Sequence, residues 1–386
     1  MQIGKAVKQR KEILQRLLPE YIDFWKSICK METPSSDKEA LNKQADFIED
    51  FAKARGFAVR RQSHTNAGDT MTIELAGKSD MAPIALLAHM DTVHEKGAFG
   101  DDVVTEKDGI LYGPGVFDCK GGIAVALLAM QVLAACGENV RTLRLILNSD
   151  EENGTFVGDA GVKFIHDAVH DACAAFNLEA GRADSLTVGR KGILKAEITV
   201  HGVAGHAGNN YFDCASAIRE ASHKIIEIEA ESERDGVTYN CGTIIGGSVT
   251  NIVPASCTIG VDIRYKNAEQ QQRAQKVLER VAEHITVEGC TAECKIIHVR
   301  PAMECTKENL ALFEKVAEAA RELGLGELIP MERGGGSDSA YTVEIGIPTV
   351  CSMGTVGRFE HTVREESQID SLASRAMLLV ESILAV

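Results

Sequence analysis

Residues 84–91 read IALLAHMD, an apolar run that ends in a histidine and, two residues later, an aspartate. Side chains alternate between the two faces of a strand, so His89 and Asp91 point to the same side where a strand over residues 83–89 leaves the core. This arrangement suits a metal-binding imidazole whose second ring nitrogen is held by a carboxylate. A single His-x-Asp is weak evidence, and the rest of the chain decides whether it carries a site.

The segments around this run alternate between strand and helix patterns. Strand-like runs lie at 70–76, 83–89 and 141–148, and an apolar helix is predicted over 121–136, between the last two of them. A strand, a helix and a strand at this spacing predict a βαβ unit, and therefore an α/β fold whose mostly parallel sheet has helices on both faces. The other elements of this part are predicted helices at 8–29, 38–55, 307–323 and 369–385 and a buried strand at 347–352.

The middle of the chain has a different pattern. From residue 191 the segments ILKAEITVHG and CTIGVDIRY alternate apolar and polar residues, as half-exposed antiparallel strands do. Helices are predicted at 213–231 and 268–286. We therefore predict an inserted α+β domain over residues 191–300, which interrupts an α/β domain formed by residues 1–190 and 301–386.

Composition and charge narrow the class of protein. The 386 residues are 45% hydrophobic and 25% charged, as in soluble globular proteins of more than one domain. A net charge of −15 argues against nucleic acid or an anionic membrane as partner. The chain has no signal-peptide pattern and no apolar run long enough to span a bilayer, and its eleven cysteines show no paired spacing, so we expect free thiols in the cytoplasm.

Five segments end in a side chain that can bind a metal ion, namely His89, Asp118, Glu152, Glu179 and His361. Sites in parallel α/β sheets collect at the carboxyl ends of strands, so these side chains are candidates to converge. Two imidazoles and three carboxylates can hold two divalent ions if one carboxylate bridges, and such mixed ligands fit zinc without excluding cobalt or manganese. Each residue alone has an ordinary structural explanation, but buried acids are rare unless they are paired or metal-bound.

The acidic pair Glu151 and Glu152 follows one of the predicted strands. Neighbouring side chains in an extended segment point apart, so one can bind metal while the other acts as a general base. A solvated acidic turn explains the sequence DEENG equally well. Eight other histidines are assigned to ordinary surface or packing positions, namely His64, His94, His166, His170, His201, His223, His284 and His298.

A series of short motifs runs through the chain in a fixed order. They are HMDT, GPGVFDCKGG, DEE, NLEAG, GHAG, TNIVPAS, DIRY and GGGSDSAY. In order and spacing they resemble the dinuclear-zinc metallopeptidases, the family of the aminoacylases, succinyl-diaminopimelate desuccinylase and the glutamate carboxypeptidases. The chain resembles the bacterial folate-cleaving glutamate carboxypeptidase in particular, also through VRPA, and the resemblance covers nearly the whole chain.

The resemblance implies two zinc ions per subunit and a role for each ligand. His89, Asp118 and Glu179 would bind one zinc ion, and Asp118, Glu152 and His361 the other, with Asp118 bridging. Cobalt or manganese would also fit these ligands.

The resemblance also implies the groups that support catalysis. Asp91 would orient His89, and Glu151 would be the general base that activates a metal-bridging water. A cis peptide is implied between Asp118 and Cys119. Cys119 stands where the glutamate carboxypeptidase that the chain resembles has an acidic residue. Its thiol could bind metal beside the bridging ligand, and a packing role is the simpler explanation.

His206, in the segment VAGHAG, lies in the inserted domain. The resemblance implies that this histidine reaches the active site of the partner subunit and stabilises the tetrahedral oxyanion. It therefore implies a homodimer formed through the inserted domain. A loop histidine beside glycines is the ordinary alternative.

Residues that bind the substrate are implied in both domains. Arg264 and Asn251 match positions that hold the substrate's terminal carboxylate, and Arg300 matches a position near the glutamate site. Arg190 is similar to an anion-binding arginine of the desuccinylase, and an arginine fork suits a carboxylate. Arginines on strands are also often only solvated.

The glycines before Ser337, Gly335 and Gly336 among them, would let the backbone approach a ligand closely. This run lacks the spacing of a nucleotide-binding loop, so a nucleotide-dependent oxidoreductase ranks last. The resemblance implies a metallo-exopeptidase or amidohydrolase that cleaves a small peptide or N-acyl amino acid next to a free carboxylate, with glutamate as the first expectation. A di- or tripeptidase, an N-acyl-amino-acid deacylase and an inactive metal-binding relative are the alternatives.

Overall fold

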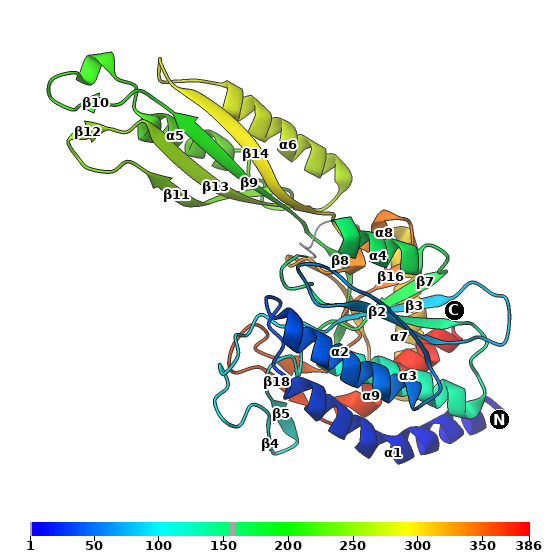
Figure 1. Cartoon of the computed structure of the whole chain (residues 1–386). Helices are drawn as coiled ribbons and strands as arrows, with labels where there is room; N and C mark the ends of the chain where they lie inside the picture. Colours follow the sequence, from blue (N-terminus) through cyan, green and yellow to red (C-terminus); the bar gives the residue numbers. More distant parts are fainter. Residues whose placement is uncertain (1, 155–158) are drawn as a thin grey trace. The chain divides into compact units, whose positions relative to one another are not determined.

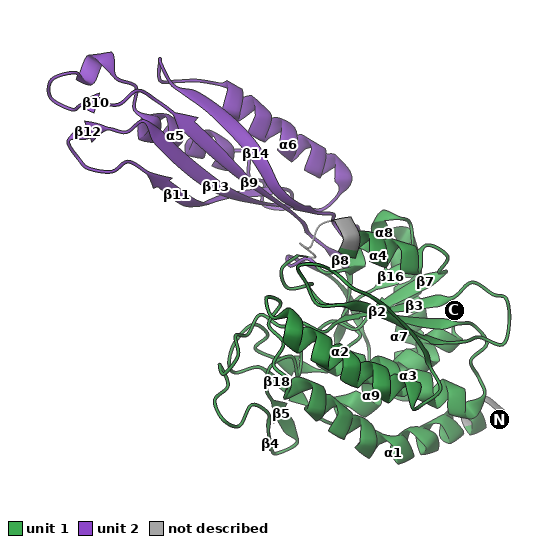
Figure 2. Cartoon of the chain, viewed as in Figure 1, with its two compact units in different colours: residues 1–188, 305–332, 337–386 green, residues 189–304, 333–336 purple. Residues whose placement is uncertain are grey.

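The computed structural model describes residues 2–154 and 159–386, and the chain divides into two compact units (Figure 2). Unit 1 consists of residues 1–188, 305–332 and 337–386, and unit 2 of residues 189–304 and 333–336. These limits lie within a few residues of the predicted ones, except that the short segment 333–336 belongs to unit 2. No helix of the described residues is long and apolar enough to cross a membrane.

A six-stranded sheet forms the centre of unit 1, with the strand order β1-β2-β6-β3-β7-β16 (Figure 1). Strands β6, β3, β7 and β16 are parallel, and β2 and β1 extend one edge in antiparallel pairing. β3 and β6 are neighbours and α3 lies between them in sequence, so the predicted βαβ unit and the α/β fold are confirmed. The strands are β1 (Ala58–Gln62), β2 (Thr70–Leu75), β3 (Ile84–His89), β6 (Leu143–Asn148), β7 (Ala174–Asn177) and β16 (Thr349–Val350).

Alternate residues of β3 contribute to two different cores. Leu86 and Ala88 belong to the larger core, which is built with α1, α3, α7 and α9. Ala85 and Leu87 belong to a smaller core, to which α4 and α8 contribute. Because β3 is buried on both faces, it reads as a continuous apolar run. The helices of unit 1 are α1 (Gln2–Cys29), α2 (Lys38–Lys53), α3 (Lys120–Cys136), α4 (Asp159–Val169), α7 (Lys307–Leu323), α8 (Ser339–Glu344) and α9 (Ser371–Leu384).

Gly122, in the first turn of α3, permits a close approach that positions the later site. A Cβ atom at Gly122 would lie 2.0 Å from the carbonyl oxygen of Leu178, a distance that no side chain tolerates. α3 therefore packs directly on the chain that leaves β7. This contact brings Asp118, just before α3, to the segment that carries Glu179.

Two small sheets complete this part of the fold. One has the order β17-β18-β5-β4 and the other pairs β15 with β8. The first sheet matters for the site because the loop between β17 and β18 carries His361. These strands are β4 (Thr105–Lys107), β5 (Ile110–Tyr112), β8 (Ser185–Arg190), β15 (Ile329–Arg333), β17 (Gly357–Arg358) and β18 (Glu366–Gln368).

Unit 2 is built on an antiparallel four-stranded sheet with the order β11-β13-β9-β14. The core of this unit lies between one face of the sheet and the helices α5 and α6. The predicted strands correspond to β9 and β13, and the structure adds β11 and β14 at the edges. The elements are β9 (Gly192–His201), β10 (Gly205–His206), α5 (Ala217–Glu229), β11 (Thr238–Gly246), β12 (Ile252–Val253), β13 (Ser256–Tyr265), α6 (Ala268–Glu283) and β14 (Thr291–Arg300), with a short 3-10 helix at Tyr211–Asp213.

A buried ion pair fastens α5 to the chain that follows α6. Lys224 Nζ lies 3.1 Å from Glu220 Oε1, and both side chains are almost completely buried. Glu220 accepts the main-chain N–H groups of Thr286 and Val287, at 3.0 and 2.7 Å. Lys224 donates to the carbonyl groups of Val281 and His284 at the end of α6. The pair therefore satisfies main-chain groups that the helix end would otherwise leave buried without partners.

We expect Glu220→Gln to lower the free energy of unfolding by about 3 kcal/mol at pH 7, because it leaves Lys224 buried without its counter-charge. Burial alone would raise the pKa of Glu220, but the N–H of Val287 and the Lys224 ammonium outweigh it and hold the pKa below its usual 4.5. The stabilisation is therefore present above that pH and is lost as the pH falls through the lower, folded-state pKa. Urea unfolding from pH 3 to 8 measures it, with the exposed Glu283→Gln as control. A pH-independent difference between wild type and variant would contradict it.

Candidate metal centre and active site

The carboxyl ends of three neighbouring parallel strands meet at one edge of the unit 1 sheet. His89 is the last residue of β3, Glu151 and Glu152 follow β6, and Glu179 follows β7. These strands lie side by side in the order β6-β3-β7. Parallel pairing places their ends together, so the four side chains meet at one place.

Two groups of potential ligand atoms share Asp118. In the first group His89 Nε2 lies 3.3 Å from Asp118 Oδ1 and 3.7 Å from Glu179 Oε1. In the second, His361 Nε2 lies 3.3 Å from Asp118 Oδ2 and 3.2 Å from Glu152 Oε2. One carboxylate oxygen of Asp118 therefore faces each group, which is the arrangement of a bridging ligand.

The spacing within each group fits a bound divalent cation. Atoms bound to one tetrahedral zinc ion at about 2.0–2.1 Å lie about 3.3 Å from one another. The ligand atoms joined above are 3.2 to 3.7 Å apart. Imidazole nitrogen and carboxylate oxygen are donors that zinc, cobalt and manganese accept. The residues present therefore fit two such ions.

The electrostatics of the cluster indicate the same need for positive charge. Hydrogen bonds to Asp118 and Glu152 raise the pKa of His361 to about 11. Burial, and next the charge of Asp118, raises the pKa of Glu152 to about 8. Both shifts arise because carboxylates are crowded in a buried space, which favours a proton on the His361 ring and on Glu152. A divalent cation would satisfy the same charges.

Asp91 organises the site from behind His89. It is fully buried, its Oδ1 lies 3.3 Å from His89 Nδ1, and its main-chain oxygen lies 3.0 Å from the same nitrogen. Its carboxylate also accepts the N–H groups of Glu151 and Glu152, at 3.2 and 3.1 Å. The hydroxyl of Ser35 donates to it at 2.6 Å. One side chain thus fixes both the ring orientation of His89 and the turn that carries the acidic pair.

Glu151 is buried beside Glu152, and its negative charge contributes to the raised pKa of that neighbour. Because Asp91 holds both N–H groups of the acidic pair, the turn after β6 has a defined backbone. A carboxylate held in this way can accept a proton beside the two ligand groups. The alternative of a solvated acidic turn does not match this burial.

Cys119 lies behind the first ligand group. The peptide bond between Asp118 and Cys119 is cis, as the family resemblance implies. Cys119 Sγ lies within 4.8 Å of the first group's ligand atoms, but its contact is with the main-chain N–H of His89, at 3.2 Å. Burial raises the pKa of this thiol, which favours its neutral form. These contacts give Cys119 a packing role.

Two arginines of unit 2 lie against the glycines of residues 335 and 336. Arg190 Nη1 donates to the carbonyl oxygens of Gly336 and Gly335, at 3.1 and 3.3 Å. A Cβ atom at Gly336 would lie 3.0 Å from Arg300 Cδ, so the absence of a side chain lets the loop approach Arg300. Arg300 is buried, with 3% of its surface exposed. The structure thus brings Arg190, Arg300, Gly335 and Gly336 together.

Arg264 and Ser337 have partners of their own. Arg264 forms a two-point ion pair with Asp262 of the same strand, with Nε–Oδ1 and Nη2–Oδ2 distances of 2.6 and 3.1 Å. Arg264 and Arg300 both pair with Ile193, so they lie in one row across the sheet. Ser337, in unit 1, is fully buried, and its Oγ accepts the N–H of Ser339 at 3.3 Å.

His206 and Asn251 lie together in unit 2. His206 pairs with Ile252 in the β10–β12 ribbon, and the N–H of Ala207 donates to the carbonyl oxygen of Asn251 at 3.0 Å. His206 Nδ1 accepts the N–H groups of Gly208 and Asn209, at 3.1 and 3.3 Å. In the neutral ring the proton therefore resides on Nε2, which is exposed with the rest of the side chain. This nitrogen can donate a hydrogen bond to an oxyanion.

Unit 2 separates His206 and Asn251 from the arginines. β12 lies just before Ser256, where β13 begins, whereas Arg264 is eight residues further along that strand. This separation corresponds to about 26 Å along an extended strand. Within one copy of unit 2, Asn251 and Arg264 therefore cannot bind the same carboxylate.

Three supporting residues escaped the sequence-based prediction. Ser35 donates a hydrogen bond to Asp91. Glu365 accepts the main-chain N–H groups of Phe117 and Asp118, at 2.8 and 3.0 Å. His94, assigned from sequence to surface or packing, is buried and lies 2.9 Å from Glu365. For these three residues, the only indication in the sequence was that Glu365 lies four residues after the candidate ligand His361.

The fold and the clustered ligands define a metal-dependent hydrolase. Residues 85–385 match the pattern of peptidase family M20/M25/M40, and the chain therefore belongs to this family, which confirms the resemblance. The chain is 29% identical over 353 residues to carboxypeptidase G2 of Pseudomonas sp. strain RS-16, covering 90% of this chain and 84% of the relative. It is 28% identical over 377 residues to succinyl-diaminopimelate desuccinylase of Rhodopseudomonas palustris strain BisA53, covering 89% and 92%. The crystal structure of aminopeptidase PepT from Bacillus cereus has the same fold, with a TM-score of 0.78, 22% identity and coverage of 96% and 98%.

Proposed function

We propose that this chain is a two-metal exopeptidase or amidohydrolase that cleaves an amide bond next to a free carboxylate. The observation that carries the proposal is the pair of ligand groups that share Asp118, at the strand ends that also carry Glu151. Zinc is the preferred ion, with cobalt or manganese as substitutes. The relative named carboxypeptidase G2 supports a C-terminal glutamate as the first candidate for the released amino acid.

The residues of the chain would divide the reaction among them. Bound divalent cations would act as Lewis acids toward the scissile carbonyl and lower the pKa of the nucleophilic water. Glu151 would take a proton from that water as it attacks, and would then pass it to the leaving amine. His206 Nε2–H would donate to the oxyanion. Asp91 would keep His89 and the turn of Glu151 in place.

The number of bound ions is directly testable. We expect the wild-type protein to bind two zinc ions. Glu179→Ala should weaken binding of the ion in the first ligand group by at least about 10-fold, because Glu179 belongs to that group only. Metal analysis after dialysis against a weak chelator should then give two ions and about one. Glu360→Ala is the control and should retain two, because this half-buried glutamate next to His361 pairs with Arg182 and belongs to neither ligand group. One ion in the wild type, or two in Glu179→Ala, would contradict the two-group assignment.

In this proposal, Arg300 and Arg190 bind the free carboxylate of the substrate. Charge-assisted contacts of an arginine fork contribute about 1.5–3 kcal/mol each, or about 10- to 150-fold in binding. We therefore expect Arg300→Met to raise KM for substrates with C-terminal glutamate by about that factor and to change kcat less. Arg273→Met, on an exposed face of α6, is the control. An unchanged KM would remove Arg300 from the substrate site.

The experiment that tests the proposal is hydrolysis of N-acyl and peptidyl substrates that differ only in the C-terminal residue, by zinc- or cobalt-loaded protein. A preference for C-terminal glutamate or aspartate supports the glutamate carboxypeptidase-like function. Turnover of neutral residues would instead select a di- or tripeptidase or an N-acyl-amino-acid deacylase, with the same chemistry. If no substrate were turned over with two ions bound, the protein would be an inactive, metal-binding relative of these enzymes.

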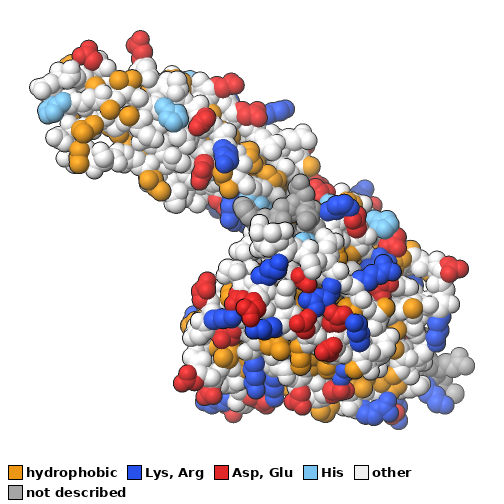
Figure 3. All heavy atoms as spheres, viewed as in Figure 1, with side chains coloured by type: hydrophobic (Ala, Val, Ile, Leu, Met, Phe, Trp, Pro, Cys, Tyr) orange, Lys and Arg blue, Asp and Glu red, His pale blue; other side chains and the backbone are white. Residues whose placement is uncertain are grey.

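We also propose that unit 2 forms a homodimer, so that His206 and Asn251 complete the site of the partner. The separation of these residues from the arginines within one copy supports this arrangement. β11 is an edge strand whose Ile244 and Ile245 are 50% and 76% exposed. Such an apolar edge is prone to pair with another chain. Figure 3 shows hydrophobic side chains gathered at the end of unit 2 that carries β10 and β12.

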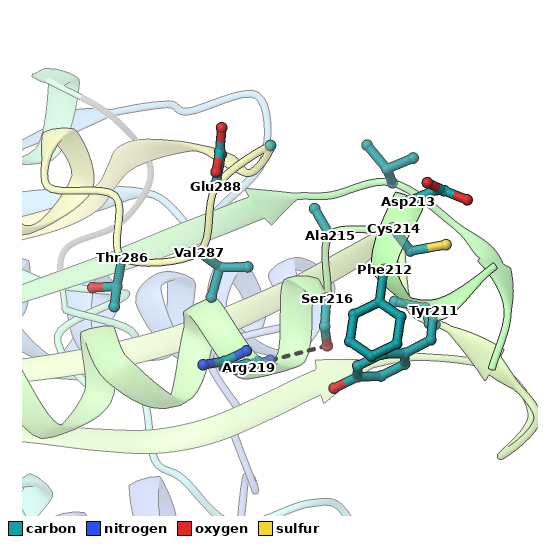
Figure 4. Close-up of a pocket in the computed structure, with 13 residues that line it drawn as sticks. Tyr211, Phe212, Asp213, Cys214, Ala215, Ser216, Arg219, Thr286, Val287 and Glu288 are labelled. Atoms are coloured by element: carbon teal, nitrogen blue, oxygen red, sulfur yellow. Dashed lines mark hydrogen bonds between the residues drawn. The ribbon is translucent and has the colours of Figure 1, made fainter. Parts of the chain in front are cut away.

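A pocket lies beside the loop that follows His206, at the same end of unit 2. Its volume is about 440 Å³, and Tyr211 and Phe212 lie at its margin (Figure 4). Phe212 is 97% exposed, although an aromatic ring of this size is normally covered by protein. This exposure supports a protein-facing surface at the end of unit 2 that carries His206.

A further inference from the structure

The carboxylate of Glu365 is buried in unit 1, with 1% of its surface exposed, four residues after His361. Its Oε1 accepts the main-chain N–H groups of Phe117 and Asp118, at 2.8 and 3.0 Å. Its Oε2 lies 3.2 Å from the N–H of Gly115 and 2.9 Å from His94 Nε2. The four contacts use the full acceptor capacity of a carboxylate, so the group is completely satisfied.

These contacts join three segments that each carry a metal-ligand candidate. His94 follows His89 and Asp91 on the chain that leaves β3. The main-chain N–H groups of Gly115, Phe117 and Asp118 belong to the loop that ends in the shared ligand. Glu365 itself closes the turn after His361. The same turn is fastened by its backbone, because the N–H of Gly113 points to the carbonyl oxygen of Glu365, at 3.4 Å.

The turn that carries His361 has a backbone that needs such support. Phe359 and His361 have φ angles of 65° and 62°, in the left-handed region that non-glycine residues rarely adopt. Conformations of this kind persist only where surrounding contacts determine them. The N–H of Glu365 donates to the carbonyl oxygen of Thr362 at 3.0 Å, which ties this residue to the turn itself.

From this geometry we propose that Glu365, held by His94, is a positioning residue that sets His361 at its distance from Asp118 and thereby forms the second ligand group. Glu365 touches no ligand side chain of that group and acts through the two backbones. The inference rests on the proposed two-metal function. It predicts that loss of Glu365 weakens binding of the second group's ion more than binding of the first group's ion, because Asp91 still holds His89 in the first group.

The test compares metal binding by Glu365→Gln, His94→Leu, His94→Gln and the wild-type protein. Apo-protein is titrated with zinc in competition with a chromophoric chelator, which resolves a tight and a weak binding step. Glutamine keeps the size of Glu365 but places an N–H group where an acceptor is needed. We expect one step to weaken by about 10- to 100-fold, the range for residues that support a ligand. The other step should change by less than about threefold, and kcat should fall with little change of KM.

Glu366→Gln is the matched control, since this neighbouring glutamate pairs with exposed Arg358, at 2.8 and 2.6 Å. His94→Gln retains an N–H donor and should recover most of the effect of His94→Leu. Equal weakening of both steps, or binding like wild type, in Glu365→Gln and His94→Leu would overturn the proposal. If Glu365→Gln does not fold, as judged by circular dichroism, the His94 pair decides. A wild-type protein with a single binding step would instead refute the proposed two-metal function.

Discussion

Replacement of Glu151 by glutamine is expected to reduce kcat by about 10³- to 10⁴-fold while both ions stay bound. General acid–base groups contribute up to about 10⁴-fold, and this residue would act twice, first on the water and then on the leaving amine. Glutamine has nearly the same size, and the N–H of residue 151 would still donate to Asp91, as it does at 3.2 Å. The metal ligands would therefore stay in place. The measurement is kcat and KM on the best substrate of the panel, together with metal content.

Glu360→Gln, at a half-buried position outside both ligand groups, provides the control for this experiment and should behave like the wild type. If Glu151→Gln retained more than about a tenth of the activity with two ions bound, Glu151 would not be the base. A loss of activity that accompanied a loss of metal would instead place Glu151 among the ligands. The two outcomes are separated by the metal content of the purified variant.

The elements that could be predicted from the sequence are those whose pattern of apolar residues follows directly from their burial. β3 is buried on both faces and reads as an unbroken apolar run, and α3 is buried on nearly every side. The edge strands β11 and β14 were not predicted. Residues 243–246 of β11 are all exposed, and β14 has a register shift near Ile296, so neither strand keeps a period of two. Pairing with β13 and β9 decides their conformation, and that information is not local.

The candidate site divides in the same way. The proposed ligands could be selected because each follows a strand or precedes a helix, and parallel strands end together. Glu365 could not be selected, because three of its partners are main-chain N–H groups 247 to 250 residues away, which no residue type marks. Its fourth partner, His94, lies 271 residues away in the sequence. For Asn251 and Arg264 the resemblance implied a shared carboxylate. The sheet of unit 2 places them at opposite ends, so they can serve one substrate only if two subunits contribute.

Two inactive variants are expected to restore activity when they are combined in one dimer. His206→Ala alone should reduce kcat by about 10²- to 10³-fold, the effect of removing one oxyanion donor. Glu151→Gln alone should be almost inactive. In a mixed dimer, the subunit with intact Glu151 faces a partner with intact His206, so one of its two sites is of wild-type composition. The other site lacks both groups.

Random reassortment after mild denaturation or co-expression makes about half of the dimers mixed, so about a quarter of wild-type activity is expected. Mixing Glu151→Gln with Glu151→Ala is the control and should give none, because every site then lacks the base. If His206 served the site of its own subunit, the mixed dimer would contain no complete site and activity would stay at the level of the single variants. We expect restored activity, because the two backbone contacts at Nδ1 of His206 keep the proton on its exposed Nε2. This N–H donor is available to an acceptor that the partner subunit brings to it.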